Sequence, residues 1–242
     1  MNEERNNGRG IFYGVIGVAT LVVAIIGATF AYFSAQSATN YVDNIEGGTN
    51  DAVGSISLTV TRVYPDKTTY ATTTGVNGLV PANIPGTTDG LDTAISNAIG
   101  SNCVDNTSGT AYVGCHVYEI SAEADSDISS ATITMDSLEL TVPDATDWHY
   151  AIFEKSGTTA SNAAPGSFPA VSSGSTSVSN IQVYQGGLNA TTLNRYLIIY
   201  ITNQNATQNR EGDGSTNQTG TYEGTVSFQV AGGNEVKATF SA

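Results

Sequence analysis

Basic residues are scarce in this sequence. Lysine and arginine together number 8 against 22 aspartates and glutamates, which gives the 242-residue chain a formal net charge of -14. A surface with so few cations cannot neutralise a row of phosphates, so the composition excludes nucleic acid as a partner. Anionic membrane surfaces would repel such a chain as well.

Residues that carry catalytic chemistry are also few. The two histidines, His116 and His149, both fall in strand-like segments, where a partly buried, hydrogen-bonded imidazole is the usual state. The sequence contains no H-E-x-x-H, G-x-S-x-G or C-x-x-C motif, so the common zinc-protease, serine-hydrolase and redox signatures are missing. The carboxylates are scattered, and no glycosidase pair can be picked out among them. We therefore predict a protein that is not an enzyme.

One long apolar run is present near the N-terminus. Residues 11–33 contain no charged side chain. About 20 residues suffice to cross a bilayer as a helix, whereas the apolar core of a signal peptide usually has about 7–15. Arg5 and Arg9 precede the run, and the next basic residue is Arg62, a pattern that directs the chain from Asp43 onward to the outside. Export to the cell surface or the medium is therefore expected.

The same segment contains a candidate cleavage site. Signal peptidase accepts small residues at the -3 and -1 positions, and Thr29 and Ala31 meet that requirement for a cut before Tyr32. Signal peptidase would then be a transient partner during export. Without cleavage, residues 11–33 would remain as the chain's one contact with the membrane.

The text around this site, "GATFAYFSA", resembles the end of a SipW-dependent signal peptide, as found in the TasA/camelysin group of secreted matrix proteins. The resemblance implies cleavage before the Tyr-Phe pair, a jelly-roll-like sandwich, and a role as subunit of an extracellular fibre or biofilm matrix. The family's short, Lys-rich leader is replaced here by the nearly neutral "MNEERNNGRG". An uncleaved anchor therefore stays open as an alternative.

Beyond the apolar run, strand patterns alternate with loops rich in Gly, Ser, Thr and Asn. "SISLTVTRVY" places Ile56, Leu58 and Val60 on one face, the period of a half-buried strand. "RYLIIYIT" is apolar on both faces, which predicts a central strand covered on both sides. In "ATITMDSLELTV" the apolar residues occupy odd-numbered positions before Asp136 and even-numbered positions after Ser137. This change predicts a β-bulge there.

About eight such strands are expected, together with one helix in "DGLDTAISNAIG". Leu91, Ile95 and Ile99 share a face of that helix, with Asp89 as the expected N-cap and Gly100 at its end. Long loops are expected at 66–88, 157–176 and 204–220.

These patterns predict an all-β fold, a jelly-roll-like two-sheet β-sandwich with one short helix, preceded by an N-terminal apolar helix. The expected division is 1–31 as signal peptide or membrane anchor, 32–54 as an N-terminal tail, and 55–242 as the sandwich domain.

Cys103 and Cys115 lie 12 residues apart and flank a single loop. In an exported protein such a pair predicts a disulfide. A free thiol or a metal pair would need neighbouring ligands, and only the two histidines are available.

One loop offers ligands for a cation. Glu211, Asp213, Ser215 and Asn217 alternate in "REGDGSTNQT", and oxygen ligands at that spacing can wrap a Ca²⁺ ion. Tyr222 stands where the full calcium-loop signature has a carboxylate, so a solvated loop is the alternative. No other cofactor is expected.

The functional expectation is a fibre subunit that polymerises with copies of itself. Cleavage before Tyr32 would free the tail 32–42, whose strand-forming residues Tyr32, Phe33, Tyr41 and Val42 suit it as a donor strand. The alternative is a membrane-anchored surface β-sandwich module that binds a glycan or a protein ligand.

Overall fold

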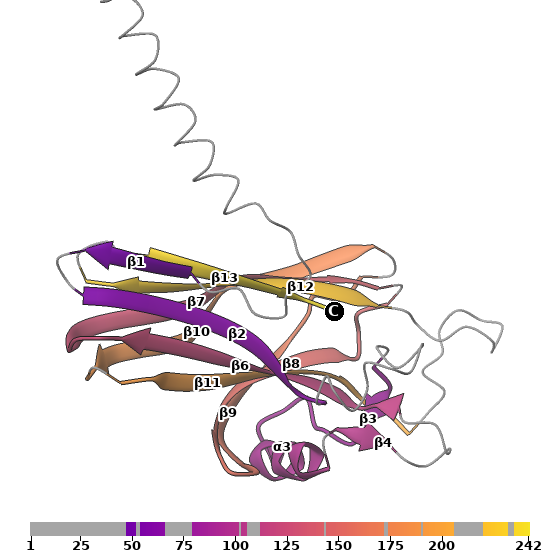
Figure 1. Cartoon of the computed structure of the whole chain (residues 1–242). Coiled ribbons are helices and arrows are strands. Elements are labelled where there is room, and N and C mark those ends of the chain that lie inside the picture. The colour runs from indigo at the N-terminus through magenta and orange to yellow at the C-terminus, as the bar shows by residue number, and fades with distance from the viewer. Residues whose placement is uncertain are drawn as a thin grey trace, which may run out of the picture. The chain divides into compact units, whose positions relative to one another are not determined.

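Antiparallel strands make up most of the described chain. The structure is a computed structural model, and it describes residues 47–51, 54–65, 79–101, 103–105, 112–142, 144–171, 174–189, 191–205, 220–231 and 235–242. All of them belong to one unit, Asp43–Ala242. The unit is a two-sheet β-sandwich with one short helix, which confirms the predicted fold class (Figure 1).

The first sheet has seven strands. Its order is β1-β2-β6-β11-β8-β9, with the short β3 parallel to the end of β11. The strands are β1 (Gly47–Asp51), β2 (Gly54–Tyr64), β3 (Pro81–Ala82), β6 (Cys115–Ala124), β8 (Trp148–Ser156), β9 (Thr159–Ser167) and β11 (Leu193–Thr202).

The second sheet has four strands in the order β10-β7-β12-β13. They are β7 (Ile128–Thr141), β10 (Ser175–Leu188), β12 (Thr221–Val230) and β13 (Glu235–Ser241). A separate two-stranded ribbon joins β4 (Val104–Asp105) to β5 (Tyr112–Val113).

The main core lies between the two sheets. Ile56, Leu58 and Val60 of β2 are buried in it, as the period-two pattern predicts. They face residues of the second sheet such as Met135 and Phe228, which are fully buried. Burial of each such side chain contributes roughly 1.5–3 kcal/mol relative to exposure.

The predicted bulge lies in β7. The pairing of β7 with β12 slips by one residue between Thr225 and Val226, so Asp136 has no opposite residue in β12. Met135 and Leu138 on either side both point into the core. The extra residue thus keeps both halves of β7 facing inward.

β11 is the central strand covered on both sides. Leu197 and Ile199 enter the core between the sheets, whereas Ile198 and Tyr200 enter a second core on the opposite face. The helix α3 (Leu91–Gly100) closes that second core with Leu91, Ile95 and Ile99. The first sheet is therefore sandwiched between the second sheet and α3 (Figure 1).

The start of α3 differs from the prediction. Gly90, with φ 70°, occupies the N-cap position, and no side chain caps the helix, so the assignment of Asp89 as the cap is wrong. The left-handed conformation of Gly90 begins the helix instead, because glycine adopts it without the Cβ clash. Gly90 also accepts the N–H of Ala94 through its carbonyl.

Two strand boundaries also differ. The loop expected at 157–176 contains β9 and the start of β10, and β10 extends over 14 residues. At the N-terminal side, β1 pairs with β2 inside the segment expected to be tail, so the sandwich begins by Gly47 and not at 55.

The predicted N-terminal apolar helix, at residues 11–33, lies outside the described residues. No helix in the described ranges is long and apolar enough to span a bilayer.

Candidate functional site

β10 is an edge strand, and its outer side has no strand partner among the described residues. Within the described part of the chain, β10 pairs with β7 alone and forms one end of the second sheet. Its sequence, STSVSNIQVYQGGL, contains no charged residue and no proline. Natural sheets usually protect such an edge with charge, proline or a covering element, because an unpaired strand is a template for another strand.

The register shows which main-chain groups of β10 face outward. The N–H of Val142 donates to the carbonyl of Gly174, so Gly174 and Val142 form a hydrogen-bonded pair. Such pairs alternate along antiparallel strands. The N–H and C=O groups of Ser175, Ser177 and Ser179 therefore point away from β7, toward the free edge.

β9, one of the two edge strands of the first sheet, is partly covered instead. The N–H of Ala160 donates to Ser96 Oγ at 2.8 Å, and the N–H of Ala163 donates to Asp92 Oδ1 at 2.9 Å. Pro165 of the same strand has no N–H to offer. Side chains of α3 thus satisfy two edge donors of β9, whereas no described residue outside β7 pairs with β10.

The outer face of the second sheet is polar. One cross-strand row consists of Ser179, Ser137, Thr225 and Thr239, so hydroxyl side chains run across all four strands. On the same face Asp136 accepts hydrogen bonds from Ser227 and Lys237, each at 2.7 Å. A face of this composition is poorly suited to apolar stacking against another sheet.

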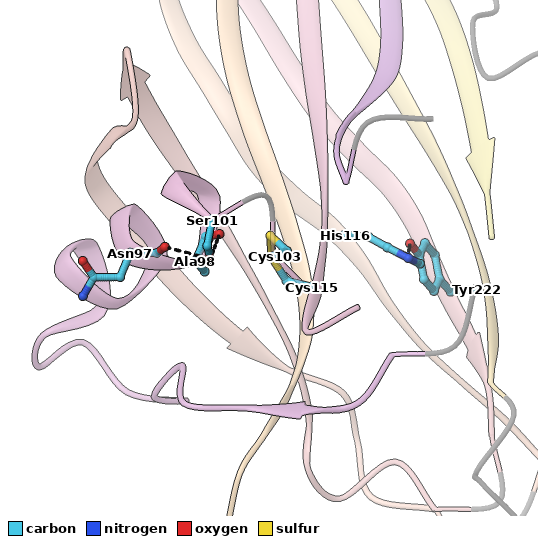
Figure 2. The surroundings of a disulfide bond; sticks show 7 residues. All are labelled: Asn97, Ala98, Ser101, Cys103, Cys115, His116 and Tyr222. Carbon is cyan, nitrogen blue, oxygen red and sulfur yellow. Dashed lines mark hydrogen bonds between the residues drawn. A yellow bond between two sulfur atoms is a disulfide. The ribbon is translucent and has the colours of Figure 1, made fainter. Parts of the chain in front are cut away.

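A buried polar cluster lies inside one end of the sandwich. His116 of β6 and Tyr222 of β12 are joined by a hydrogen bond of 2.5 Å, and Tyr118 lies 2.9 Å from Tyr222 (Figure 2 draws His116 and Tyr222). The ring of Phe240 packs against Tyr118 at 4.6 Å. Among the described residues, Nε2 of His116 and Nε of Arg62 have no hydrogen-bond partner.

Burial sets the protonation states of this cluster. Desolvation, assisted by the positive charge of Arg62, lowers the pKa of His116 to about 3. Desolvation also raises the pKa of Tyr118 to about 12 and that of Tyr222 well above its usual value. The three side chains are therefore neutral at ordinary pH. A neutral imidazole enclosed by aromatic rings suits a structural role.

The predicted disulfide is confirmed. Cys103 and Cys115 are bonded, with their Cα atoms 5.2 Å apart. Cys103 follows α3, and Cys115 begins β6, so the bond joins the end of the helix to the first sheet (Figure 2). Two main-chain hydrogen bonds reinforce the junction, from Cys103 N to Ala98 O and from Gly114 N to Cys103 O.

The other predicted sites lie outside the described residues. These are the cleavage site at Thr29, Ala31 and Tyr32, the donor-strand residues Tyr32, Phe33, Tyr41 and Val42, and the calcium candidates Glu211, Asp213, Ser215 and Asn217. Among the residues that are described, no three His, Cys, Asp or Glu side chains are grouped so as to hold a metal ion.

Sequence reasoning missed the contrast between the two edges. The absence of charge and proline over residues 175–188 is visible in the sequence and could have marked β10 as an unprotected edge. The covering of β9 by Asp92 and Ser96 could not have been found, because these residues are more than 60 positions away from Ala160 and Ala163.

Comparisons with known proteins add little. No protein-family model and no curated protein matches the chain. Among solved structures it is similar to a DUF4466 family protein from Parabacteroides merdae, with 10% sequence identity and a TM-score of 0.23. That match covers 76% of this chain and 42% of the other, so the chain spans less than half the length of that protein.

Proposed function

We propose that this protein is a structural subunit of an extracellular fibre or biofilm matrix. In the proposed assembly, residues 32–42 of one copy add as a strand to the free edge of β10 in the next copy. The observation that carries the proposal is the uncharged, proline-free edge of β10, which contrasts with the covered edge of β9.

The chemistry of the donor segment fits this acceptor. Residues 32–42, YFSAQSATNYV, contain no charge and no proline, so nothing in them blocks main-chain pairing. The outward N–H and C=O groups of Ser175, Ser177 and Ser179 would pair with the donor, as in other cases of strand addition. A neutral strand is also the suitable partner for a chain of net charge -14, because it adds no charge repulsion.

The geometry of such a contact leads to a filament. The donor segment and the acceptor edge are different parts of the chain, so each copy would use one surface to give and another to receive. A heterologous contact of this kind does not close on itself unless its rotation happens to form a ring. While the apolar segment 11–33 is attached, the membrane would restrain the donor segment 32–42. Cleavage would therefore be required before assembly.

The proposal is tested by removing the donor. Protein that begins at Tyr32 is expected to form fibres visible by electron microscopy, and protein that begins at Asp43 is expected to remain monomeric. If both remain monomeric at high concentration, the fibre proposal is wrong, and the anchored module that binds a glycan or protein ligand takes its place.

The acceptor is tested separately by Ser177→Pro. This change removes an N–H that points toward the free edge and leaves the hydrogen bonds between β10 and β7 in place. Fibres are expected to be lost in Ser177→Pro and retained in Ser177→Ala, which keeps the N–H. Fibres that persist in Ser177→Pro would show that the donor strand uses another edge.

A further inference from the structure

A groove lies beside the disulfide, on the side of the first sheet that carries α3. Its volume is about 860 Å³, and it is lined by α3, by the segment around β3 and by the turn at Cys103. This volume falls within the roughly 300–1,000 Å³ that is usual for small-molecule sites. Figure 2 shows the end of α3, where Ala98 and Ser101 lie between Asn97 and the disulfide; Asn97, Ala98, Ser101 and Cys103 all line the groove.

The walls of the groove are fixed by several independent contacts. The disulfide and the hydrogen bond from Cys103 N to Ala98 O hold the end of α3. On the opposite wall, β3 pairs with β11, and Asn203 N donates to Ala82 O at 2.8 Å. A preformed site binds its ligand without the entropic penalty of ordering its walls.

The polar groups that line the groove are amides and hydroxyls. Asn83 accepts a hydrogen bond from Asn203 through Oδ1, and its NH₂ group, which no hydrogen bond among the described residues engages, can donate. Ser101 Oγ donates to the carbonyl groups at the end of α3, which leaves its lone pairs free to accept. Asn97 and Thr93 are exposed one helical turn apart, and the Asn97 amide can both donate and accept.

The lining also limits the charge of a ligand. None of the described residues that line the groove is charged, so no ion pair is available there for an anionic or a cationic group. Between the amides lie small apolar residues, namely Pro81, Ala82, Ala94 and Ala98. The groove therefore suits a neutral molecule that carries hydroxyl groups, amide groups and small methyl groups together.

We infer that this groove binds a neutral oligosaccharide of N-acetylated amino sugars. The hydroxyls of such a sugar match the mixed donors and acceptors of Asn83, Asn97 and Ser101. Its acetamide group pairs with a side-chain amide, and the acetamide methyl packs on the alanines of α3. The inference is independent of fibre assembly, because the groove lies on the face of the first sheet that is turned away from the second sheet and its β10 edge.

The test uses protein isolated from cells and the β-1,4-linked tetramer of N-acetylglucosamine as probe. Binding is measured by calorimetry, and the contact residues are located from amide chemical shifts. Saturable binding with shifts confined to α3, β3 and the Cys103 turn is expected. The tetramer of glucose, which lacks the acetamide groups, is expected to bind at least tenfold more weakly.

Variants then connect the binding to the groove. Asn97→Ala combined with Ser101→Ala is expected to weaken the affinity at least tenfold, and Asn194→Ala, at the opposite end of β11, is expected to leave it unchanged. The inference is overturned if millimolar probe produces no shifts, if the shifts lie elsewhere, or if the glucose tetramer binds equally well. Equal affinity of the double variant and the wild type would overturn it as well.

Discussion

The phenol oxygen of Tyr222 lies 2.5 Å from Nδ1 of His116, and this hydrogen bond joins the two sheets across the interior of the sandwich. Tyr222 belongs to β12 of the second sheet and His116 to β6 of the first. Both side chains are buried, with 4% and 1% of their surface exposed. This hydroxyl therefore satisfies Nδ1 of the buried imidazole, whereas Nε2 has no partner among the described residues, which makes the pair sensitive to the loss of either side chain.

Replacement of Tyr222 by phenylalanine is expected to destabilise the fold by about 1–3 kcal/mol, because it leaves Nδ1 of His116 buried without a partner. The change in the free energy of unfolding is measured by urea denaturation. Tyr184→Phe is the matched control. Its hydroxyl donates to the carbonyl of Gly187 at an exposed position, so a change within about 0.5 kcal/mol is expected there. Equal losses in the two variants would contradict the prediction.

The same cluster predicts a loss of stability in mild acid. The pKa of His116 is about 3 in the folded state against 6.5 for a free imidazole. Below pH 6.5 the imidazole of His116 therefore binds a proton in the unfolded chain but not in the folded chain. The free energy of unfolding consequently falls as the pH drops toward 3. The expected fall is about 1.4 kcal/mol per pH unit once the pH is well below 6.5.

This prediction is measured as the free energy of unfolding between pH 7 and pH 5, where most carboxylates stay ionised. In His116→Gln the free energy of unfolding is expected to depend less steeply on pH, whatever the stability of the variant at pH 7. Some slope remains, since burial also lowers the pKa of His149. An unchanged slope in His116→Gln would assign the acid sensitivity to other groups.

Much of the fold could be predicted because a regular spacing of apolar residues along the chain reflects the burial of one face of a strand or helix. The alternation in β2, the doubly apolar β11 and the parity change at Asp136 each follow from which side chains are buried. β9 and the start of β10 could not be predicted as well, since their Ser, Thr, Asn and Gly residues have the composition of loops. These segments are strands because β7 and β8 supply hydrogen-bonding partners, and that pairing is invisible in the local sequence.

Removal of the disulfide is expected to destabilise the protein by roughly 3 kcal/mol in the chain-entropy model, since the bond closes a short loop. The double variant Cys103→Ala, Cys115→Ala is compared with the wild type by thermal and urea unfolding. Alkylation of native protein without reductant should label neither cysteine. Quantitative labelling of both in freshly isolated protein would show that the bond does not form in the cell.

Two glycines are expected to respond in opposite directions to the same substitution. A Cβ on Gly224 would lie 2.3 Å from the ring of Phe240, its cross-strand partner, so Gly224→Ala is expected to destabilise by about 1–3 kcal/mol through overpacking. A Cβ on Gly100 at the end of α3 would meet nothing within 4 Å. Gly100→Ala is expected to be neutral or to stabilise by up to about 1 kcal/mol, because alanine loses less backbone entropy. Both values come from urea denaturation, and similar destabilisation by both variants would contradict the prediction.

The last prediction concerns the covered edge of β9. Ser96 Oγ and Asp92 Oδ1 accept the N–H groups of Ala160 and Ala163, so Asp92→Ala combined with Ser96→Ala would expose two edge donors. An edge opened in this way should pair with other copies. Increased association is expected by light scattering in protein that begins at Asp43, where the donor segment 32–42 is absent and cannot contribute.

The matched control for this change is Thr88→Ala combined with Asp89→Ala. It also removes one negative charge and one hydroxyl, here from the turn before α3, and neither side chain is hydrogen-bonded to β9 among the described residues. If the control associates as strongly as the edge variant, the effect comes from the lost charge. If neither variant associates, then features of β9 itself, such as Pro165, suffice to close this edge without the helix. Association confined to the edge variant would mean that α3 limits assembly by covering the β9 edge of the first sheet.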